Sequence, residues 1–257
     1  MYFDTHAHYD DEKFDFDRDE AIKRAYNEGV LNIVNIGADI ESSKRSIELA
    51  NKYDFIYAAV GVHPEEIEKL PHDYIEVLED LVNNNREKVV AIGEIGLDYC
   101  CSDVAREVQK KFFIEQINLA KRLDLPIVIH SRDASLDTLN IIKSEDVGSV
   151  GGILHCFSGS QEMADEVLKN GLYIAIGGVV TFKNAKKIVD VIRNVPLDRL
   201  LVETDLPYLS PEPLRGKRNE SGNLKYIVQK IAEIKDISVD EVAKITTDNA
   251  KKLYRLS

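Results

Sequence analysis

Short apolar runs alternate with amphipathic stretches along the whole chain. Runs such as LNIVNIG at 31–37 and LYIAIG at 172–177 show little polar alternation, which is typical of strands buried on both faces. The stretches between them place apolar residues near helical spacing, which predicts helices that pack on one side. The pattern predicts strands at 2–6, 31–37, 55–63, 89–94, 126–130, 150–155, 172–177 and 200–205.

Predicted helices fill the intervals between these strands. They cover 18–28, 41–52, 71–83, 104–123, 133–143, 161–169 and 183–193. A loop rich in proline and charge follows at 206–222, and two further helices come after it. The segment Ser238-Val-Asp-Glu241 has the pattern of a capping box, which marks the start of the last helix.

The order of these elements indicates a fold class. Strict alternation of strand and helix argues for a parallel sheet, and eight such units suggest a sheet closed into a barrel. We predict an α/β fold, a single TIM-type (β/α)8 barrel domain over residues 1–257 with extra C-terminal helices. The alternative, an open doubly wound sheet, would want a glycine-rich phosphate turn after an early strand, and the sequence has none.

Residues suited to metal binding gather where the predicted strands end. Asp4, His6 and His8 alternate along the first strand, so we expect their side chains to project together. In a barrel of this type the active site lies at the rim formed by the carboxyl ends of the strands. Seven candidates belong to this rim: His6, His8, His63, Glu94, His130, His155 and Asp205.

A single histidine at a strand end is more often a hydrogen-bonded or surface residue than a ligand. Seven ionisable groups at one rim are different, because burying them uncompensated would cost several kcal/mol each. Bound cations would satisfy them. Two divalent ions about 4 Å apart can share a hydroxide and clamp the attacking and leaving oxygens of a phosphoester.

The two carboxylates have different candidate roles in such a site. Glu94 lies between the histidines in chain order and is the candidate bridge between two ions. Asp205 can bind one ion and accept a proton from the attacking water as general base. Glu203 shares a face with Asp205 one layer deeper, where it either supports a metal ligand or is a structural carboxylate of the barrel.

Charge and composition narrow the possible partners and compartments. The net charge is −12, whereas proteins that bind duplexes usually carry a basic footprint. A nucleic-acid substrate would therefore need bound metal and a local basic patch.

The sequence also bears on the compartment. No apolar run approaches the roughly 20 residues that span a membrane, and the acidic N-terminus lacks a signal-peptide pattern. The three cysteines do not form the pattern of a disulfide framework. We expect a cytoplasmic protein with no membrane partner, and a monomer.

Six motifs spread over the chain carry a family resemblance. They are Phe3-Asp4-Thr-His6-Ala-His8, Gly61-Val-His63-Pro64, Gly93-Glu94-Ile-Gly96-Leu-Asp98-Tyr99, His130-Ser-Arg132-Asp133-Ala134, His155-Cys-Phe157-Ser-Gly159 and Glu203-Thr-Asp205-Leu-Pro207-Tyr208. Together they resemble the TatD family of metal-dependent hydrolases in the amidohydrolase superfamily, whose members include Mg²⁺-dependent deoxyribonucleases. Many other amidohydrolases bridge their metals with a carbamylated lysine at the end of strand 4, where this chain has Glu94.

The resemblance implies a division of the ligands between two ions. One ion would be held by His6, His8, Glu94 and Asp205, and the other by Glu94, His130 and His155. By the same resemblance, His63 would contact the scissile phosphate. The pair Cys100-Cys101 departs from the bulky residues expected after Tyr99, which makes the substrate-side wall of this loop particular to this chain.

Further substrate contacts are predicted from the loops after strands 5, 7 and 8. The candidate phosphate contacts are Arg132, Lys183 and Arg215, the last in the run Arg215-Gly-Lys217-Arg218. Lys183 and Arg215 are placed where such barrels often bind phosphate, in the loops after strands 7 and 8. Lys217 and Arg218 could equally be surface residues of a solvated basic run with no contact to substrate. Tyr99 and Tyr208 could stack on a base, and packing explains each of them equally well.

The leading functional hypothesis is a metal-dependent phosphodiesterase that acts on DNA, exonucleolytically, at single-stranded or frayed ends. It would use two divalent ions, a metal-bound hydroxide and the catalytic residues Asp205, Glu94 and His63. By affinity the ligands suit Zn²⁺, Mn²⁺ or Fe²⁺, and Mg²⁺ if supply and activity select it. No serine or cysteine is paired with a spare histidine, so a nucleophile triad is not expected. The alternatives are an amide or ester hydrolase of deacylase type on the same scaffold, and a metal-bearing barrel without catalysis.

Overall fold

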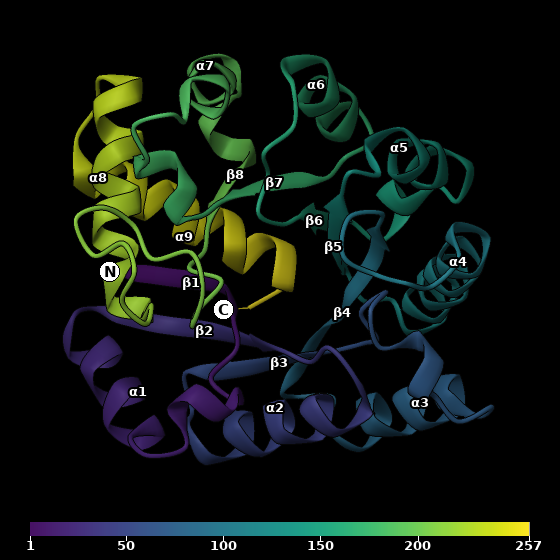
Figure 1. Ribbon diagram of the computed structural model, residues 1–257. Coiled ribbons are helices and arrows are strands. Elements are labelled where there is room, and N and C mark those ends of the chain that lie inside the picture. The colour runs from purple at the N-terminus through teal and green to yellow at the C-terminus, as the bar shows by residue number, and fades with distance from the viewer. Residues whose placement is uncertain (257) are drawn as a thin grey trace.

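Eight parallel strands form the inner wall of the molecule, and helices surround them (Figure 1). The computed structural model describes residues 1–256, apart from the side chain of Lys69. The strands follow one another in sequence order, and each pairs in parallel with the next. They are β1 (Tyr2–Ala7), β2 (Val30–Ile36), β3 (Ile56–Val60), β4 (Val89–Asp98), β5 (Ile127–Arg132), β6 (Gly152–Leu154), β7 (Tyr173–Ile176) and β8 (Leu200–Val202). The predicted TIM-type (β/α)8 barrel is confirmed.

The helices alternate with the strands as predicted and shift by a few residues at their ends. Among the described residues they are α1 (Arg18–Asn27), α2 (Ile40–Lys52), α3 (Tyr74–Asn84), α4 (Arg106–Leu123), α5 (Ser135–Ser144), α6 (Gln161–Lys169), α7 (Lys186–Asn194), α8 (Leu224–Lys235) and α9 (Val239–Tyr254). Helix α8 completes the eighth strand–helix unit, and α9 is additional. No helix in the described part of the chain is long and apolar enough to cross a membrane.

Strand β4 is longer than the sequence pattern predicts. The prediction that Glu94 ends this strand is wrong, because Gly96 and Asp98 still pair with His130 and Arg132 of β5. Gly96 makes this possible: its φ is +144°, and a Cβ at this position would overlap the carbonyl oxygen of His130. As a result Glu94 projects from the middle of β4, and Asp98 joins the rim.

The barrel closes between β1 and β8 through a few backbone bonds and one buried carboxylate. The Asp205 N–H donates to the His6 carbonyl at 2.9 Å, and the His8 N–H donates to the Leu206 carbonyl at 3.0 Å. Deeper in the seam, the Asp4 carboxylate accepts the Thr204 N–H at 2.9 Å and the Thr204 hydroxyl at 2.6 Å. The prediction that Asp4 projects with the two histidines is therefore wrong. A register shift between Asp4 and Ala7 breaks the simple alternation.

Helix α9 covers the end of the barrel opposite the rim. The Tyr254 hydroxyl donates to the Thr5 carbonyl at 3.1 Å, and the Tyr254 ring stacks on Phe3 with 5.8 Å between centroids. Ala250, Leu253 and Tyr254 join the apolar cluster that fills the barrel, beside strand-start residues such as Phe3 and Tyr173. The Ser238 hydroxyl accepts the Glu241 N–H at 3.2 Å at the predicted start of this helix. The filled interior gives the rim a rigid base.

The loop after β8 is anchored to α1 by a network of charges. Arg218 donates to both oxygens of Asp17, at 2.6 and 2.7 Å, and to Glu220 at 2.9 Å. Arg24 also reaches Asp17 and Glu220, at 2.9 and 2.8 Å. Arg218 is therefore committed to a structural contact. Hydrogen bonds from Arg218 and Arg24 hold the pKa of Asp17 well below its usual range.

Asp17→Asn should lower the free energy of unfolding by about 1 kcal/mol at neutral pH, because the amide is a weaker acceptor for two guanidinium groups. A carboxyl whose pKa is lower in the folded state stabilises the fold above its unfolded pKa of about 4, and this stabilisation is lost as the pH falls toward the folded value. Urea unfolding at a series of pH values should therefore show the difference shrinking from about pH 5 to about pH 3.

Asp248→Asn is the matched control, because it removes an exposed pair with Lys244 at 2.8 Å on α9. It should change stability by a few tenths of a kcal/mol at most. A difference for Asp17→Asn that equals the control, or that does not depend on pH, would contradict this account of the loop.

Candidate metal centre

The first group of candidate ligands surrounds one oxygen of Glu94. The Nε2 atoms of His6 and His8, both from the end of β1, lie 3.0 Å apart. Glu94 Oε2 lies 3.4 and 3.8 Å from these two nitrogens, and Asp205 Oδ1 lies 3.7 and 3.6 Å from them. Asp205 adopts φ 55°, a left-handed conformation that aspartate tolerates better than most residues.

The second group faces the other oxygen of the same carboxylate. Glu94 Oε1 lies 2.8 Å from His155 Nε2, 2.9 Å from His130 Nδ1 and 3.7 Å from His63 Nε2. These histidines come from the segments that follow β3 and β6 and from β5 itself. One carboxylate thus lies between two sets of imidazoles, and the structure brings all seven predicted residues together.

Burial and charge act against each other in this cluster. Burial lowers the pKa of His63 to about 4, which keeps this imidazole neutral. Burial also opposes the ionisation of Glu94, yet the surrounding imidazoles hold its pKa well below the usual range. For His8, burial favours the neutral form, but Asp205 and Glu94 outweigh burial and raise the pKa to about 9. A buried anion in this place depends on positive charge nearby.

The donor set fits divalent cations. His6 Nε2 and His8 Nε2 point at the same place, 3.0 Å apart. His8 Nδ1 lies 2.9 Å from the Ile36 carbonyl, which keeps a proton on Nδ1 and leaves Nε2 as the atom of His8 that can bind a cation. His6 is fully buried, and its Nδ1 atom has no hydrogen-bond partner among the described residues. Imidazole nitrogen and carboxylate oxygen are ligands for Zn²⁺ and related ions. Three sets of such atoms each lie within 4.8 Å of one another. They are His6, His8 and Asp205; His63, Glu94 and His130; and His6, His155 and Glu203.

Asp98 supports the centre from behind, a role that the sequence analysis missed. Its Oδ2 lies 3.0 Å from His130 Nε2, and its Oδ1 accepts the N–H groups of Cys100 and Cys101 at 2.8 and 2.7 Å. Burial opposes its ionisation, but these hydrogen bonds hold the pKa of Asp98 well below the usual range. Asp98 lies four positions after Glu94, and side chains an even number of positions apart on a strand share a face. A prediction that extended the strand beyond Glu94 would therefore have placed Asp98 on the same face as Glu94.

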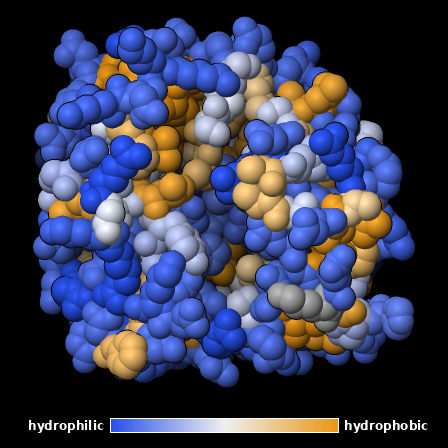
Figure 2. Space-filling view, viewed as in Figure 1, coloured by the Kyte–Doolittle hydropathy of each residue, from blue (hydrophilic) through white to orange (hydrophobic). Residues whose placement is uncertain are grey.

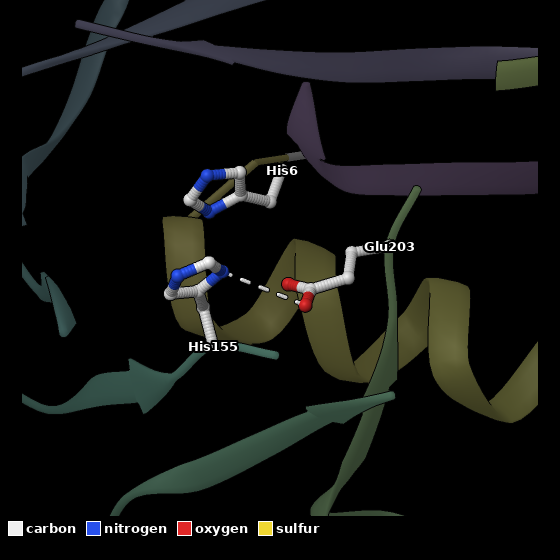
Figure 3. Close-up of side chains that lie close together, drawn as sticks. All are labelled: His6, His155 and Glu203. Atoms are coloured by element: carbon white, nitrogen blue, oxygen red, sulfur yellow. Dashed lines mark ion pairs between the residues drawn. The ribbon is translucent and has the colours of Figure 1, made fainter. Parts of the chain in front are cut away.

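Glu203 lies beside His155 on the side away from Glu94 (Figure 3). The His6 and His155 rings stack with 4.0 Å between centroids, and Glu203 Oε1 lies 3.6 Å from His155 Nδ1. The same oxygen accepts the Cys156 N–H at 2.5 Å. Glu203 is fully buried, so it can orient His155 with Nε2 toward Glu94.

A cavity of about 800 Å³ opens over the cluster. Figure 2 shows a mostly hydrophilic surface around a central hollow. Of the predicted substrate contacts, Arg132 and Tyr208 line this cavity together with His63. The Tyr208 side chain is half exposed, and its hydroxyl donates to Asp11 at 2.9 Å.

The other three predicted contacts do not line this cavity. The Tyr99 hydroxyl donates to Asp137 at 2.6 Å, and Arg106 covers its ring at 4.4 Å. Lys183 lines a separate groove, and Arg215 lies over the Phe182 ring at 4.5 Å. Tyr99 therefore packs against its own loop, while Lys183 and Arg215 lie beyond the rim.

Comparisons with known proteins agree on one family. A family model described as TatD related DNase matches residues 3–255. The chain is 48% identical over 257 residues to the uncharacterized metal-dependent hydrolase YabD of Bacillus subtilis, covering 100% of both proteins. It is 38% identical over 256 residues to the uncharacterized metal-dependent hydrolase YcfH of Escherichia coli, covering 98% of this chain and 95% of YcfH. The crystal structure of YjjV, a TatD homologue from Escherichia coli K12, matches with a TM-score of 0.94 at 34% identity, covering 100% of this chain and 98% of that one.

Asp98→Asn should weaken metal affinity about 10- to 100-fold, the usual cost of losing a group that orients a ligating histidine. The amide keeps the shape of the side chain, but it is a poorer partner for the His130 N–H. Competition with a chromogenic chelator measures the affinity.

Asp137→Asn is the control, because Asp137 pairs with Tyr99 nearby and has no contact with His130. It should bind metal as the wild type does. Equal affinities for the Asp98 and Asp137 variants would show that Asp98 has no part in holding the metal.

Proposed function

The chain belongs to the TatD-related DNase family, and from that premise we propose that it is a metal-dependent hydrolase of DNA phosphodiester bonds. The coarser part of this proposal, a metal-dependent hydrolase, is supported by the relatives and by the donor set of the centre. The choice of DNA as substrate rests on the family model, and the two-ion mechanism rests on one observation. Each oxygen of Glu94 faces its own set of imidazoles, which is the arrangement expected of a carboxylate bridging two ions.

The two proposed ion sites divide the ligands as the family pattern does. His6, His8, Glu94 and Asp205 would hold one ion, and Glu94, His130 and His155 the other. Divalent cations bound there would polarise a phosphoryl oxygen and lower the pKa of a water. The ligands suit Zn²⁺, Mn²⁺ or Fe²⁺ by affinity, and Mg²⁺ where supply favours it.

Asp205 is the proposed general base. Its carboxylate is ionised, because His8 and the neighbouring imidazoles outweigh burial and lower its pKa. It lines the cavity, so a water between it and the substrate is within reach. Accepting the proton of this water as it attacks phosphorus avoids the formation of free hydroxide.

His63 and Arg132 are the proposed contacts of the scissile phosphate. The Glu65 N–H donates to His63 Nδ1 at 3.3 Å, so the proton of this neutral imidazole lies on Nε2, which faces the centre. His63 can therefore donate a hydrogen bond to a phosphate oxygen. Arg132, on the wall of the same cavity, supplies a positive charge that does not titrate.

The cavity suits the end of a strand. Its volume of about 800 Å³ falls in the range of small-molecule sites. Such a cavity takes in one or two nucleotides of a single strand, and a duplex would have to fray before its end could enter. This supports exonucleolytic cleavage at single-stranded or frayed ends.

A second candidate is a hydrolase of amides or esters on the same scaffold. Acidic residues around the cavity favour a less anionic substrate, among them Asp10, Asp11, Glu12 and Glu65. Turnover of end-labelled single strands should be compared with turnover of acylated amines and esters, with each metal and with EDTA. EDTA-sensitive release of nucleotides supports the nuclease; cleavage of the acylated substrates alone would replace it with this second candidate.

Asp205→Asn should lower kcat on a labelled single strand about 10²- to 10⁴-fold, since it removes the general base. Asparagine tolerates the left-handed conformation of this position, so the variant should remain folded. Single-turnover assays with saturating metal measure the effect.

Asp236→Asn is the control, because Asp236 has the same left-handed conformation at the end of α8, with φ 55°. It should retain full activity. An Asp205 variant that binds metal and cleaves as fast as this control would remove Asp205 from the mechanism and favour a barrel whose metal has no catalytic role.

A further inference from the structure

Acidic residues dominate one side of the cavity. The segments after β1, β2 and β3 carry Asp10, Asp11, Glu12, Asp39, Glu65 and Glu66. The lining has two cations: Arg45, which is paired with Asp10 at 3.4 Å, and Arg132 at the end of β5, which forms no ion pair with a described residue. A phosphodiester chain that reaches the metal centre would be repelled along the acidic segments, which favours a continuation past Arg132.

A second cavity continues from Arg132 toward α7. It has a volume of about 330 Å³ and shares Arg132 and His155 with the cavity over the metal centre. Its far wall includes Lys187, in the first turn of α7. This cavity runs from the predicted metal ligand His155 to the start of the helix, with the cations Arg132 and Lys187 and the carboxylate Asp133 in its lining.

Lys186, the chain neighbour of Lys187, lines a separate groove between α7 and α8, which are neighbours in the outer ring (Figure 1). This groove has a volume of about 520 Å³ and is lined by Phe182, Lys183, Lys186, Arg193 and Lys230. Its one acidic lining residue, Asp190, is paired with Arg193 at 2.7 Å. Lys230 is paired with Glu233 at 3.0 Å, so the excess positive charge of the groove comes from Lys183 and Lys186, in a chain whose net charge is −12.

Three lysines lie just before α7 or in its first turn and form no close ion pair, although the charge of Lys187 also acts on Glu162 of α6 and lowers its pKa. Lys183, Lys186 and Lys187 are all exposed, and none forms an ion pair with another described residue. About half of the other cations in the described part of the chain have carboxylate partners, for example Lys44 with Glu41 at 2.7 Å. Unpaired lysines are a feature by which proteins hold the phosphates of single-stranded nucleic acid. The Phe182 ring beside them carries Arg215 over one face at 4.5 Å, so it is the lysines that favour nucleic acid in this groove.

We propose that the single-stranded phosphodiester chain of the substrate leaves the metal centre past Arg132 and follows Lys187, Lys186 and Lys183 into the groove between α7 and α8. This deepens the proposed nuclease function, since the centre would hold the end of the strand while the groove holds the nucleotides behind it. It also reconciles an acidic protein with a polyanionic substrate, because the contact surface is local and basic.

The contact has a measurable electrostatic signature. Each phosphate neutralised by a lysine releases counterions, so the logarithm of the binding constant falls with the logarithm of salt concentration by about 0.7 per contact for single strands. Removing two lysine contacts should reduce this slope by about 1.4.

The test uses the double variant Lys186→Gln/Lys187→Gln, and Lys23→Gln/Lys44→Gln as a control with the same net charge and exposed positions on α1 and α2. Binding of fluorescent single strands of about 12 nucleotides, as DNA and as RNA, is followed by anisotropy against salt in an Asp205→Asn background. The groove variant should bind about tenfold more weakly or worse, with the smaller salt slope, while the control keeps both values. Identical affinities and slopes for the groove variant and the control would overturn the proposal.

Turnover separates this proposal from the nuclease assignment. With Asp205 present, hydrolysis of bis(4-nitrophenyl) phosphate should have the same kcat in wild type and groove variant, because this ester fits inside the centre. KM for the labelled strands should rise in the groove variant alone. If the wild type cleaves strands and both variants have the same KM as the wild type, the proposed groove contact is wrong and the nuclease assignment stands. If the wild type cleaves no strand, the nuclease assignment is wrong, and the anisotropy measurement alone tests whether the groove binds single strands.

Discussion

The burial of one carboxylate among five imidazoles is the constraint on which this structure depends. Glu94 is 5% exposed, and its two oxygens face His6 and His8 on one side and His63, His130 and His155 on the other. An ionised carboxylate withdrawn from water loses several kcal/mol of solvation, and it stays ionised here only because positive charge lies beside it. Divalent cations would supply that charge and would give the converging nitrogen lone pairs a common partner.

The rest of the fold keeps these groups in place. Gly96 lets β4 and β5 approach closely enough for β4 to pass Glu94 and reach Asp98, which holds His130. On the opposite side of the barrel, the Asp4 carboxylate and the His6 carbonyl close the seam that carries Asp205. Helix α9 fills the far end of the barrel with Tyr254. A ligand set drawn from separate strands can keep its geometry only on such a rigid frame.

The sequence predicted the barrel and its ligand-bearing rim because both follow from periodicity. Buried parallel strands leave apolar runs, and their carboxyl ends meet at one rim, so His6, His130 and Asp205 could be brought together without coordinates. The predictions for the end of β4 and for the direction of Asp4 were wrong, because both depend on local departures from the regular alternation of a strand. The reach of β4 beyond Glu94 depends on Gly96, and the turn of Asp4 into the seam depends on a register shift.

Side chains in the loops could not be placed from the sequence, because neighbours distant in the chain decide where they point. Tyr99 is held by Asp137, Arg215 by Phe182 and Arg218 by Asp17. These partners lie outside any local pattern. The cytoplasmic location and the monomeric state remain predictions, since neither follows from the geometry of the barrel.

The most direct test of the central claim is anomalous diffraction from crystals of the wild-type protein grown with Mn²⁺. The account predicts two peaks about 3.5–4 Å apart, one beside each oxygen of Glu94, with His6, His8 and Asp205 around the first and His130 and His155 around the second. A single peak, or peaks that do not flank Glu94, would contradict it.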